Sequence, residues 1–385
     1  MPKLLIVKEK RQYNITNEEC SYEQTIAEQN LTDNIVNIAC LELDNIMKND
    51  EMPRSVWNWL NNKLEKNELF SNISVSKLGK KILDQYNVTC VLEEVRIKKY
   101  FYETQKRSDL SYCTATYTIF KGNKFVASEL FVLNNDEANC WEKIIIDRIL
   151  DDIHWYELPK DNSRPIPKIW LLSEDVAGYF FHECIGHILE EDVFRFAEYK
   201  IGDKVINGKV DIYENWNTSE RSDDFGSELR KTLLVRQGKL CGFLPEQRQS
   251  EHKNIGNRLT EDPYLPPCVR MTHMFVCGEV GFEDELVEGQ DIMYIQEVSG
   301  GECDPFSGEI GLCAKKICFI EAGKKTDYCE PMSLLFNIKD LQNVKIKLGS
   351  ISKENKALCF KNGAIKLVKY TTPCILMDWR GLNEK

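Results

Sequence analysis

Three runs of alternating apolar and polar residues constrain the fold of this chain more than any other sequence feature. They read VTCVLEEVRI, SYCTATYTIF and KFVASELFVL, at residues 88–97, 111–120 and 124–133. A period of two is typical of strands that bury one face, and the Lys-Gly-Asn sequence between the last two runs is typical of a hairpin turn. The three runs therefore predict a small antiparallel sheet.

The segment that follows the predicted sheet has a helical period instead. Residues 137–153 read EANCWEKIIIDRILDDI, with apolar side chains every fourth residue at Trp141, Ile145, Ile149 and Ile153. Residues four apart lie on one face of a helix, so this helix is expected to pack across the sheet.

Two further regions complete an α+β organisation. Residues 1–86 are predicted to be a mostly helical N-terminal region, because apolar residues after Pro53 are spaced by three and four. The proline-rich polar segment 159–168 separates a small α+β middle domain, 87–160, from a β-rich C-terminal domain, 165–385, which carries one helix.

Composition excludes several functional classes. The chain of 385 residues has 61 acidic and 50 basic side chains and a formal charge of −11, which disfavours nucleic acid and anionic membranes as partners. No segment approaches the roughly 18 apolar residues of a membrane span, and the first residues lack the apolar core of a signal peptide. The 15 cysteines are scattered without CxxC pairs, so we expect reduced thiols in a cytoplasmic protein.

One helix of the C-terminal domain contains two of the five histidines of the chain. The sequence HECIGH places His182 and His187 five residues apart, with Glu183 after the first. Five residues of a regular helix separate two side chains by about 140°, so a straight α-helix cannot present both imidazoles to one metal ion. A π-turn absorbs one extra residue, and Gly186 is a residue that permits such a distortion. Ser173 is a plausible N-cap for this helix.

Two interpretations of the motif are open at this point. In the first, the imidazoles supply two zinc bonds, a third protein ligand and a water complete the site, and Glu183 is the general base. In the second, the helix is an ordinary core helix and its histidines are only hydrogen-bonded. Its apolar side chains would then form a buried face, made of Phe180, Phe181, Ile185, Ile188 and Leu189.

The chain resembles the TldD/PmbA family of metallopeptidases. HECIGHILEED is similar to the family's H-E-A-x-G-H-x-L-E-x-D signature, and GNRLTEDPYLPPCVRMTHMF to its G-N-x-R and L-P-x-P-R-M-T-N segments. SGGECDPFSGEIGLCAKKICFIEAGK and ALCFKNGA resemble two later family segments. The similarity covers roughly residues 87–382 with the motifs in family order, and the N-terminal 86 residues are unlike the usual N-terminal domain.

The resemblance implies a set of site residues, position by position. His182, His187 and Cys359 correspond to zinc ligands, and Glu183 to the catalytic base. Glu190 and Asp192 correspond to acids that orient a ligand from behind. The substrate-binding positions are Arg270, Thr272, Gly300 and Gly301.

Two positions in these motifs depart from the family pattern. His273 stands where the family has asparagine, and alternation along a strand should point it away from the side that Arg270 faces. Phe360 stands where the family has a glycine directly after the ligand cysteine, which we expect to change the floor of the pocket.

The resemblance also implies an activity. We expect a cytoplasmic, Zn²⁺-dependent peptidase that hydrolyses short or unfolded peptides. It would work as a homodimer or as a heterodimer with a related subunit that lacks the metal ligands. The alternative is a noncatalytic scaffold or peptide-binding subunit of such a dimer. Such subunits lose the histidines that this chain retains.

Overall fold

A computed structural model describes most of the chain. The described residues are 4–15, 20–31, 85–101, 106–133, 141–196, 198–217, 221–246, 248–250, 253–281, 291–304 and 307–381. None of the helices in these ranges is long and apolar enough to cross a membrane.

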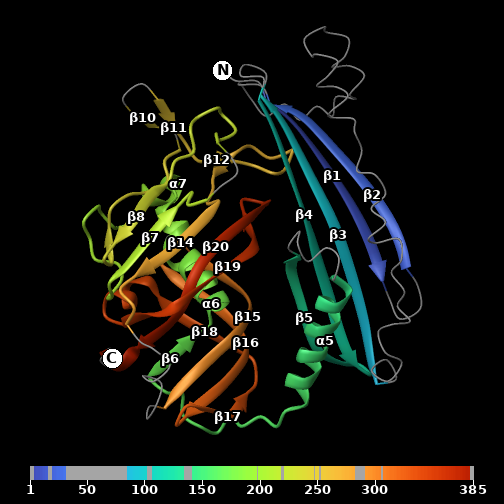
Figure 1. Ribbon diagram of the computed structural model, residues 1–385, viewed down its shortest axis with the longest axis vertical. Helices are drawn as coiled ribbons and strands as arrows, with labels where there is room; N and C mark the ends of the chain where they lie inside the picture. The colour runs from blue at the N-terminus through green and yellow to red at the C-terminus, as the bar shows by residue number, and fades with distance from the viewer. Residues whose placement is uncertain are drawn as a thin grey trace.

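The three alternating runs form neighbouring strands of one antiparallel sheet, as predicted. They are β3 (Tyr86–Phe101), β4 (Lys106–Lys121) and β5 (Lys124–Leu133), and β4 and β5 are joined by the expected turn. Two more strands, β1 (Leu4–Ile15) and β2 (Cys20–Leu31), extend this sheet to five strands in the order β2-β1-β3-β4-β5. The sheet stands beside the C-terminal domain in Figure 1.

The prediction of a mostly helical N-terminal region is therefore wrong for the first 31 residues as far as they are described. β1 pairs with β3 along its whole length, so the boundary placed at residue 86 cuts through a single sheet. The physical reason is that strand pairing is a long-range interaction, which a short polar segment such as KEKRQYN does not reveal by its own periodicity. The helices expected between residues 33 and 84 lie outside the described residues.

The predicted helix is α5 (Trp141–Glu157), and it packs on this sheet. Ile145 and Ile149 are buried against strand residues such as Leu92 and Ile119, and Ile153 is partly buried beside them. Burying an isoleucine side chain contributes about 1.5–3 kcal/mol, so the four-residue spacing seen in the sequence accounts for the position of α5.

The C-terminal domain is built on one mixed sheet of eleven strands. Most neighbours are antiparallel, but β6 is parallel to β15 and β14 to β20. The strands are β6 (Ile169–Leu172), β7 (Val210–Glu214), β8 (Thr232–Arg236), β9 (Lys239–Leu240), β14 (His273–Gly278), β15 (Ile292–Asp304), β16 (Glu309–Glu321), β17 (Lys324–Cys329), β18 (Met332–Asn337), β19 (Lys345–Lys361) and β20 (Ala364–Asp378).

Shorter elements surround this sheet. Two hairpins form separate two-stranded sheets: β10 (Arg248–Ser250) with β11 (Lys253–Ile255), and β12 (Arg258–Leu259) with β13 (Cys268–Val269). The helical segments are α6 (Glu174–Phe181), η3 (His182–Gly186), η4 (His187–Leu189), α7 (Glu191–Phe194), η6 (Ile338–Gln342) and η7 (Trp379–Gly381).

Helix α6 lies across the sheet at the centre of the domain (Figure 1) and contacts β15, β19 and β20. Its apolar side chains, including Phe180 and Phe181, are buried in the main core. This packing fixes the segment that follows α6, which carries the two histidines.

Candidate metal centre

The helix that carries the histidines begins as the sequence predicts. The Ser173 hydroxyl accepts a hydrogen bond from the Val176 backbone N–H at 3.3 Å, and Glu174 and Asp175 occupy the first turn. An acceptor at the N-cap satisfies one of the free N–H groups of the first turn, and acids there oppose the positive end of the helix.

The helix changes its winding at the motif. Residues His182–Gly186 form a π-helical turn, in which the His187 backbone N–H donates to the carbonyl of His182, five residues earlier. The predicted π-turn is therefore confirmed, and it turns His187 back toward His182: their ring centroids are 4.7 Å apart. A short 3-10 segment and the extended backbone of Glu190 then end the helix.

Gly186 has a different role from the one expected. Its backbone is in the ordinary right-handed region, with φ −57° and ψ −58°, so the turn does not need glycine for its dihedral angles. A Cβ at this position would lie 2.3 Å from the sulfur of Met271. Glycine at this position therefore relieves close packing against the end of the Met271 side chain, and not backbone strain.

Cys359 is brought to the two histidines by strand β19. Its Sγ lies 3.6 Å from His187 Nε2, although the two residues are 172 positions apart in the chain. One donor atom each from His182, His187 and Cys359 lies within 4.8 Å of the other two. Two imidazole nitrogens and one sulfur, mostly buried, form a donor set that suits Zn²⁺ with one coordination position left open.

Glu190 orients the second histidine. Its side chain is fully buried, and its Oε2 lies 3.1 Å from His187 Nδ1, which leaves Nε2 directed toward Cys359. Burial alone would lower the pKa of His187, but the Glu190 carboxylate and the contact with Cys359 raise it well above its usual value. Burial and the neighbouring His187 lower the pKa of His182, so the surroundings shift the pKa values of the two imidazoles in opposite directions.

Asp192 lines the pocket and is tied to Glu190 by Lys361, a residue that the sequence analysis missed. The Lys361 Nζ lies 2.7 Å from Glu190 Oε2 and 2.8 Å from Asp192 Oδ2. The available signal was its position two residues after Cys359, because alternate residues of a strand share one face.

Glu183 lies beside the imidazole of His187. Its Oε2 is 3.9 Å from His187 Nε2, the nitrogen that contacts Cys359 Sγ. Burial raises the pKa of this carboxyl group, the adjacent His187 lowers it, and Glu190 and Glu302 raise it further. A desolvated carboxylate beside an open coordination position can accept a proton from water.

The four residues open onto a pocket of about 890 Å³ between α6, β5, β15 and β19, a volume typical of ligand sites. Gly300 and Gly301 line it, as the resemblance implies. A Cβ on Gly301 would lie 3.0 Å from Glu183 Cγ and 2.8 Å from a methyl group of Leu312. Glycine therefore keeps the space next to Glu183 open.

Several pocket residues were not identified from the sequence. Asp175 and Tyr179 line the pocket with Glu183, and a spacing of four residues on one helix face was a signal for them. Glu129 and Arg148 come from β5 and α5, and only the tertiary structure brings them there. Phe360, the departure from the family pattern, lines the pocket and is 63% exposed.

Arg270 and Thr272 do not line the pocket. Arg270 is buried and donates to the carbonyls of Cys359, Lys361 and Ala364 at 2.7, 3.2 and 3.4 Å. The Thr272 hydroxyl contacts Glu214 and Asn215. The two residues therefore do not occupy the substrate-binding positions that were predicted for them. The Arg270 guanidinium instead holds the backbone that carries Cys359.

His273 also lies away from the pocket. It is buried, and its Nε2 lies 2.8 Å from the Thr371 hydroxyl. The alternation expected between Arg270 and His273 does not apply, because β13 ends at Val269 and β14 begins at His273.

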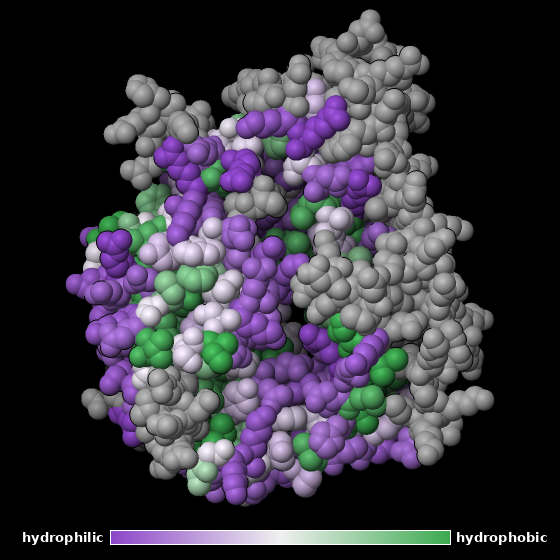
Figure 2. All heavy atoms as spheres, in the orientation of Figure 1, coloured by the Kyte–Doolittle hydropathy of each residue, from purple (hydrophilic) through white to green (hydrophobic). Residues whose placement is uncertain are grey.

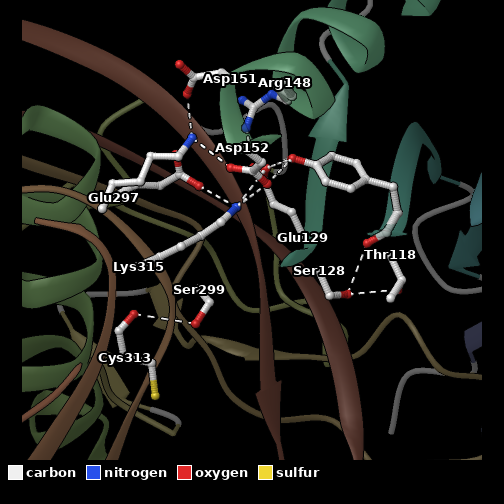
Figure 3. A network of polar contacts seen from close by, with 12 residues as sticks. Thr118, Ser128, Glu129, Arg148, Asp151, Asp152, Glu297, Ser299, Cys313 and Lys315 are labelled. Atoms are coloured by element: carbon white, nitrogen blue, oxygen red, sulfur yellow. Dashed lines mark hydrogen bonds and ion pairs between the residues drawn. The ribbon is translucent and has the colours of Figure 1, made fainter. Parts of the chain in front are cut away.

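A second cluster of acids, Glu129, Asp152 and Glu297, has ligand atoms close enough together to hold a metal ion. Two lysine ammonium groups occupy that position instead (Figure 3). Lys315 Nζ lies 2.7 Å from Asp152 and 2.8 Å from Glu297, and Lys316 Nζ lies 2.8 and 2.6 Å from the same two carboxylates. We assign this cluster a structural role.

Comparison with known proteins gives a consistent assignment. Residues 170–378 match the C-terminal domain of the PmbA/TldA metallopeptidases. A metalloprotease of Methanocaldococcus jannaschii is 26% identical over 220 residues, which are 52% of this chain and 48% of that protein. A zinc metalloprotease TldD homolog of Saccharolobus solfataricus is 26% identical over 186 residues, 45% of this chain and 40% of that protein.

The chain thus spans about half or less of the length of these relatives. Among solved structures, TldE from Thermococcus kodakarensis superposes with a TM-score of 0.60 at 13% identity, covering 98% of this chain and 95% of the other. That likeness is one of fold.

Proposed function

The chain belongs to the TldD/PmbA family of metallopeptidases, and we propose that it is a zinc-dependent peptidase that hydrolyses short or unfolded peptides. One observation carries the proposal. The π-turn at His182–Gly186 brings both imidazoles to the Cys359 sulfur, with the Glu183 carboxylate beside them.

Each residue of the site has a defined task in this proposal. His182, His187 and Cys359 would hold Zn²⁺, which when bound polarises the scissile carbonyl and activates water. Glu183 Oε2 accepts a proton from the attacking water and passes it to the leaving amine. Glu190 keeps the His187 imidazole oriented through Nδ1.

The shape of the pocket supports an extended peptide as substrate. Asp175 of α6 and Glu183 of η3 both line the pocket, and the eight helical residues from one to the other correspond to about 12 Å. Three to four extended residues span that length. This length suits a short or unfolded chain, which is the substrate class that we propose.

The test compares two variants of adjacent residues. Glu183→Gln keeps the size of the side chain but removes the basic oxygen, so zinc content should persist while peptide turnover falls by about 10²–10⁴. His182→Ala removes a ligand and should lose both zinc and turnover. Metal analysis and cleavage of an unstructured peptide library measure the two quantities.

Two outcomes would reject the proposal. Cleavage by Glu183→Gln at the rate of the parent, at equal zinc content, would show that Glu183 is not the base. A parent protein that binds zinc but cleaves no peptide, alone or with a related chain, would favour the scaffold alternative.

A further inference from the structure

Lys361 joins the two parts of the chain that supply the metal ligands. Its three N–H groups have three acceptors: Glu190 Oε2 at 2.7 Å, the Asp192 carboxylate at 2.8–2.9 Å and the Val269 carbonyl at 3.1 Å. An ammonium group has three donors, so this geometry uses the full capacity of the side chain. Only 12% of that side chain is exposed.

Lys361 contacts the candidate ligand His187 indirectly, through the Glu190 carboxylate. The same oxygen, Glu190 Oε2, contacts both His187 Nδ1 and Lys361 Nζ. The other oxygen, Oε1, is buried without a hydrogen-bond partner among the residues that the structure describes. Removal of Lys361 would leave a buried carboxylate with His187 alone, and such a charge is strongly destabilised.

The position of Lys361 on β19 links it to the third ligand. Cys359 and Lys361 are two residues apart and face the protein interior, while Phe360 between them is exposed. Arg270 fixes the carbonyls of both residues from behind. Lys361 therefore ties the strand that presents Cys359 to the helix end that presents His187.

We propose that Lys361 is a positioning residue of the metal centre, which holds Glu190 in the rotamer that directs His187 Nε2 toward the metal. The inference rests on the proposed metal site but not on peptide cleavage. Loss of an outer partner of this kind weakens metal binding by about 10–100-fold in metalloproteins. An ordinary structural ion pair would change the stability of the fold and leave the affinity for metal unchanged.

The experiment measures Co²⁺ and Zn²⁺ binding by the full chain in competition with a chelator. Co²⁺ also gives a thiolate absorption band that reports ligation by Cys359. We expect Lys361→Met to bind both ions about 10–100-fold more weakly and Lys361→Arg, which keeps the charge, to lose less. Lys345→Met is the matched control at the exposed start of the same strand, and its affinity should equal that of the parent.

A double variant tests whether Lys361 acts through Glu190. Glu190→Gln already removes the carboxylate that Lys361 contacts. Adding Lys361→Met to Glu190→Gln should therefore weaken metal binding by less than about twofold relative to Glu190→Gln alone, because the effects of coupled residues are not additive. A further tenfold loss in the double variant would overturn the inference. This comparison also decides the case in which Lys361→Met alone does not fold.

Failure of this inference is distinct from failure of the proposed function. Parent-like affinity and an unchanged thiolate band in folded Lys361→Met would overturn the role of Lys361 only. A parent that binds no Co²⁺ or Zn²⁺ would overturn the metal site itself, and this inference with it. A parent that binds metal without cleaving peptides leaves the inference intact and rejects the peptidase.

Discussion

Two buried cysteines show how position decides the chemistry of a residue. Cys184 lies inside the HECIGH motif and Cys359 far from it in sequence, yet only Cys359 has its sulfur beside His187. Cys184 belongs to the hydrophobic core. Burial raises the pKa of its thiol well above the usual value, and the nearby Cys303 and Glu183 add to this effect, so it stays a neutral core side chain.

This difference predicts opposite results for the same substitution at the two positions. Cys359→Ser should reduce the zinc retained after dialysis against a chelator, because a hydroxyl is a poor replacement for a thiolate ligand. Cys184→Ser should retain zinc and lose only stability, since it buries a hydroxyl among apolar side chains. Equal zinc loss in the two variants, or zinc loss only in His273→Ala, would mean that the third ligand is another residue.

The elements of the site differ in how far the sequence predicted them. The π-turn followed from arithmetic, since five residues of a regular helix leave two side chains on different faces. Its ligand partner did not, because nothing in the residues around Cys359 distinguishes it from the other cysteines without the family resemblance. The reason is physical: β19 is brought to the helix by its pairing with β20 in the large mixed sheet, a long-range contact that local sequence does not reveal.

The sequence predicted some elements of the N-terminal sheet and missed others. β3, β4 and β5 alternate clearly and were predicted, as was α5, because each buries a regular face of its own. β1 and β2 carry polar or charged residues at many positions and gave no clear period, so the pairing of β1 with β3 and of β2 with β1 was missed. Local periodicity thus finds elements that define a core, and not those that extend a sheet edge.

Helix α6 packs closely on β20 at Gly178, so a substitution there tests how the packing of this helix contributes to stability. A Cβ on Gly178 would lie 2.0 Å from the ring of Tyr370, whereas one on Gly186 would meet the end of the flexible Met271 side chain at 2.3 Å. We expect Gly178→Ala to lower the free energy of unfolding by at least the 1–3 kcal/mol typical of overpacking. Gly186→Ala should cost less, because a methionine can change rotamer.

Denaturant titration of the two variants measures this difference, and zinc content shows whether the helix keeps its place. Equal stability of Gly178→Ala and the parent would mean that α6 can move away from β20 without cost. That result would remove the packing argument for the position of the histidines.

At the scale of the whole molecule, the pocket depends on how the N-terminal sheet meets the C-terminal domain. β5 lines one wall and β15 and β19 line the others, and hydrophilic residues are prominent on the face between the two units in Figure 2.

The proposed dimer and the cytoplasmic location stay predictions from the sequence.

A β-bulge between β15 and β16 brings charged residues of the C-terminal sheet to α5. Its register shift lets the consecutive residues Lys315 and Lys316 both reach Asp152 of α5, with Glu297 of β15 completing the cluster. Regular alternation would send one of the two lysines to the opposite face of the sheet. The bulge therefore builds a buried charge cluster across the junction that also borders the pocket.

Asp152 is the central anion of this junction, and its removal gives the last prediction. Burial would raise the pKa of Asp152, but Lys315 and Lys316 lower it below its usual value, so its stabilising charge is present at neutral pH and is lost only as the pH falls through that lowered pKa. Asp152→Asn should therefore reduce the free energy of unfolding at pH 7 by about 3–5 kcal/mol, the usual cost of breaking a buried ion pair. Asp151→Asn is the matched control and should lose less stability, because Asp151 is 53% exposed and Lys316 keeps Asp152 and Glu297 as partners without it. Denaturant titration gives the energies, and hydrogen exchange should show faster exchange in β4 and β15 of Asp152→Asn. Equal stability of the two variants would mean that the junction is held by apolar packing and not by this cluster.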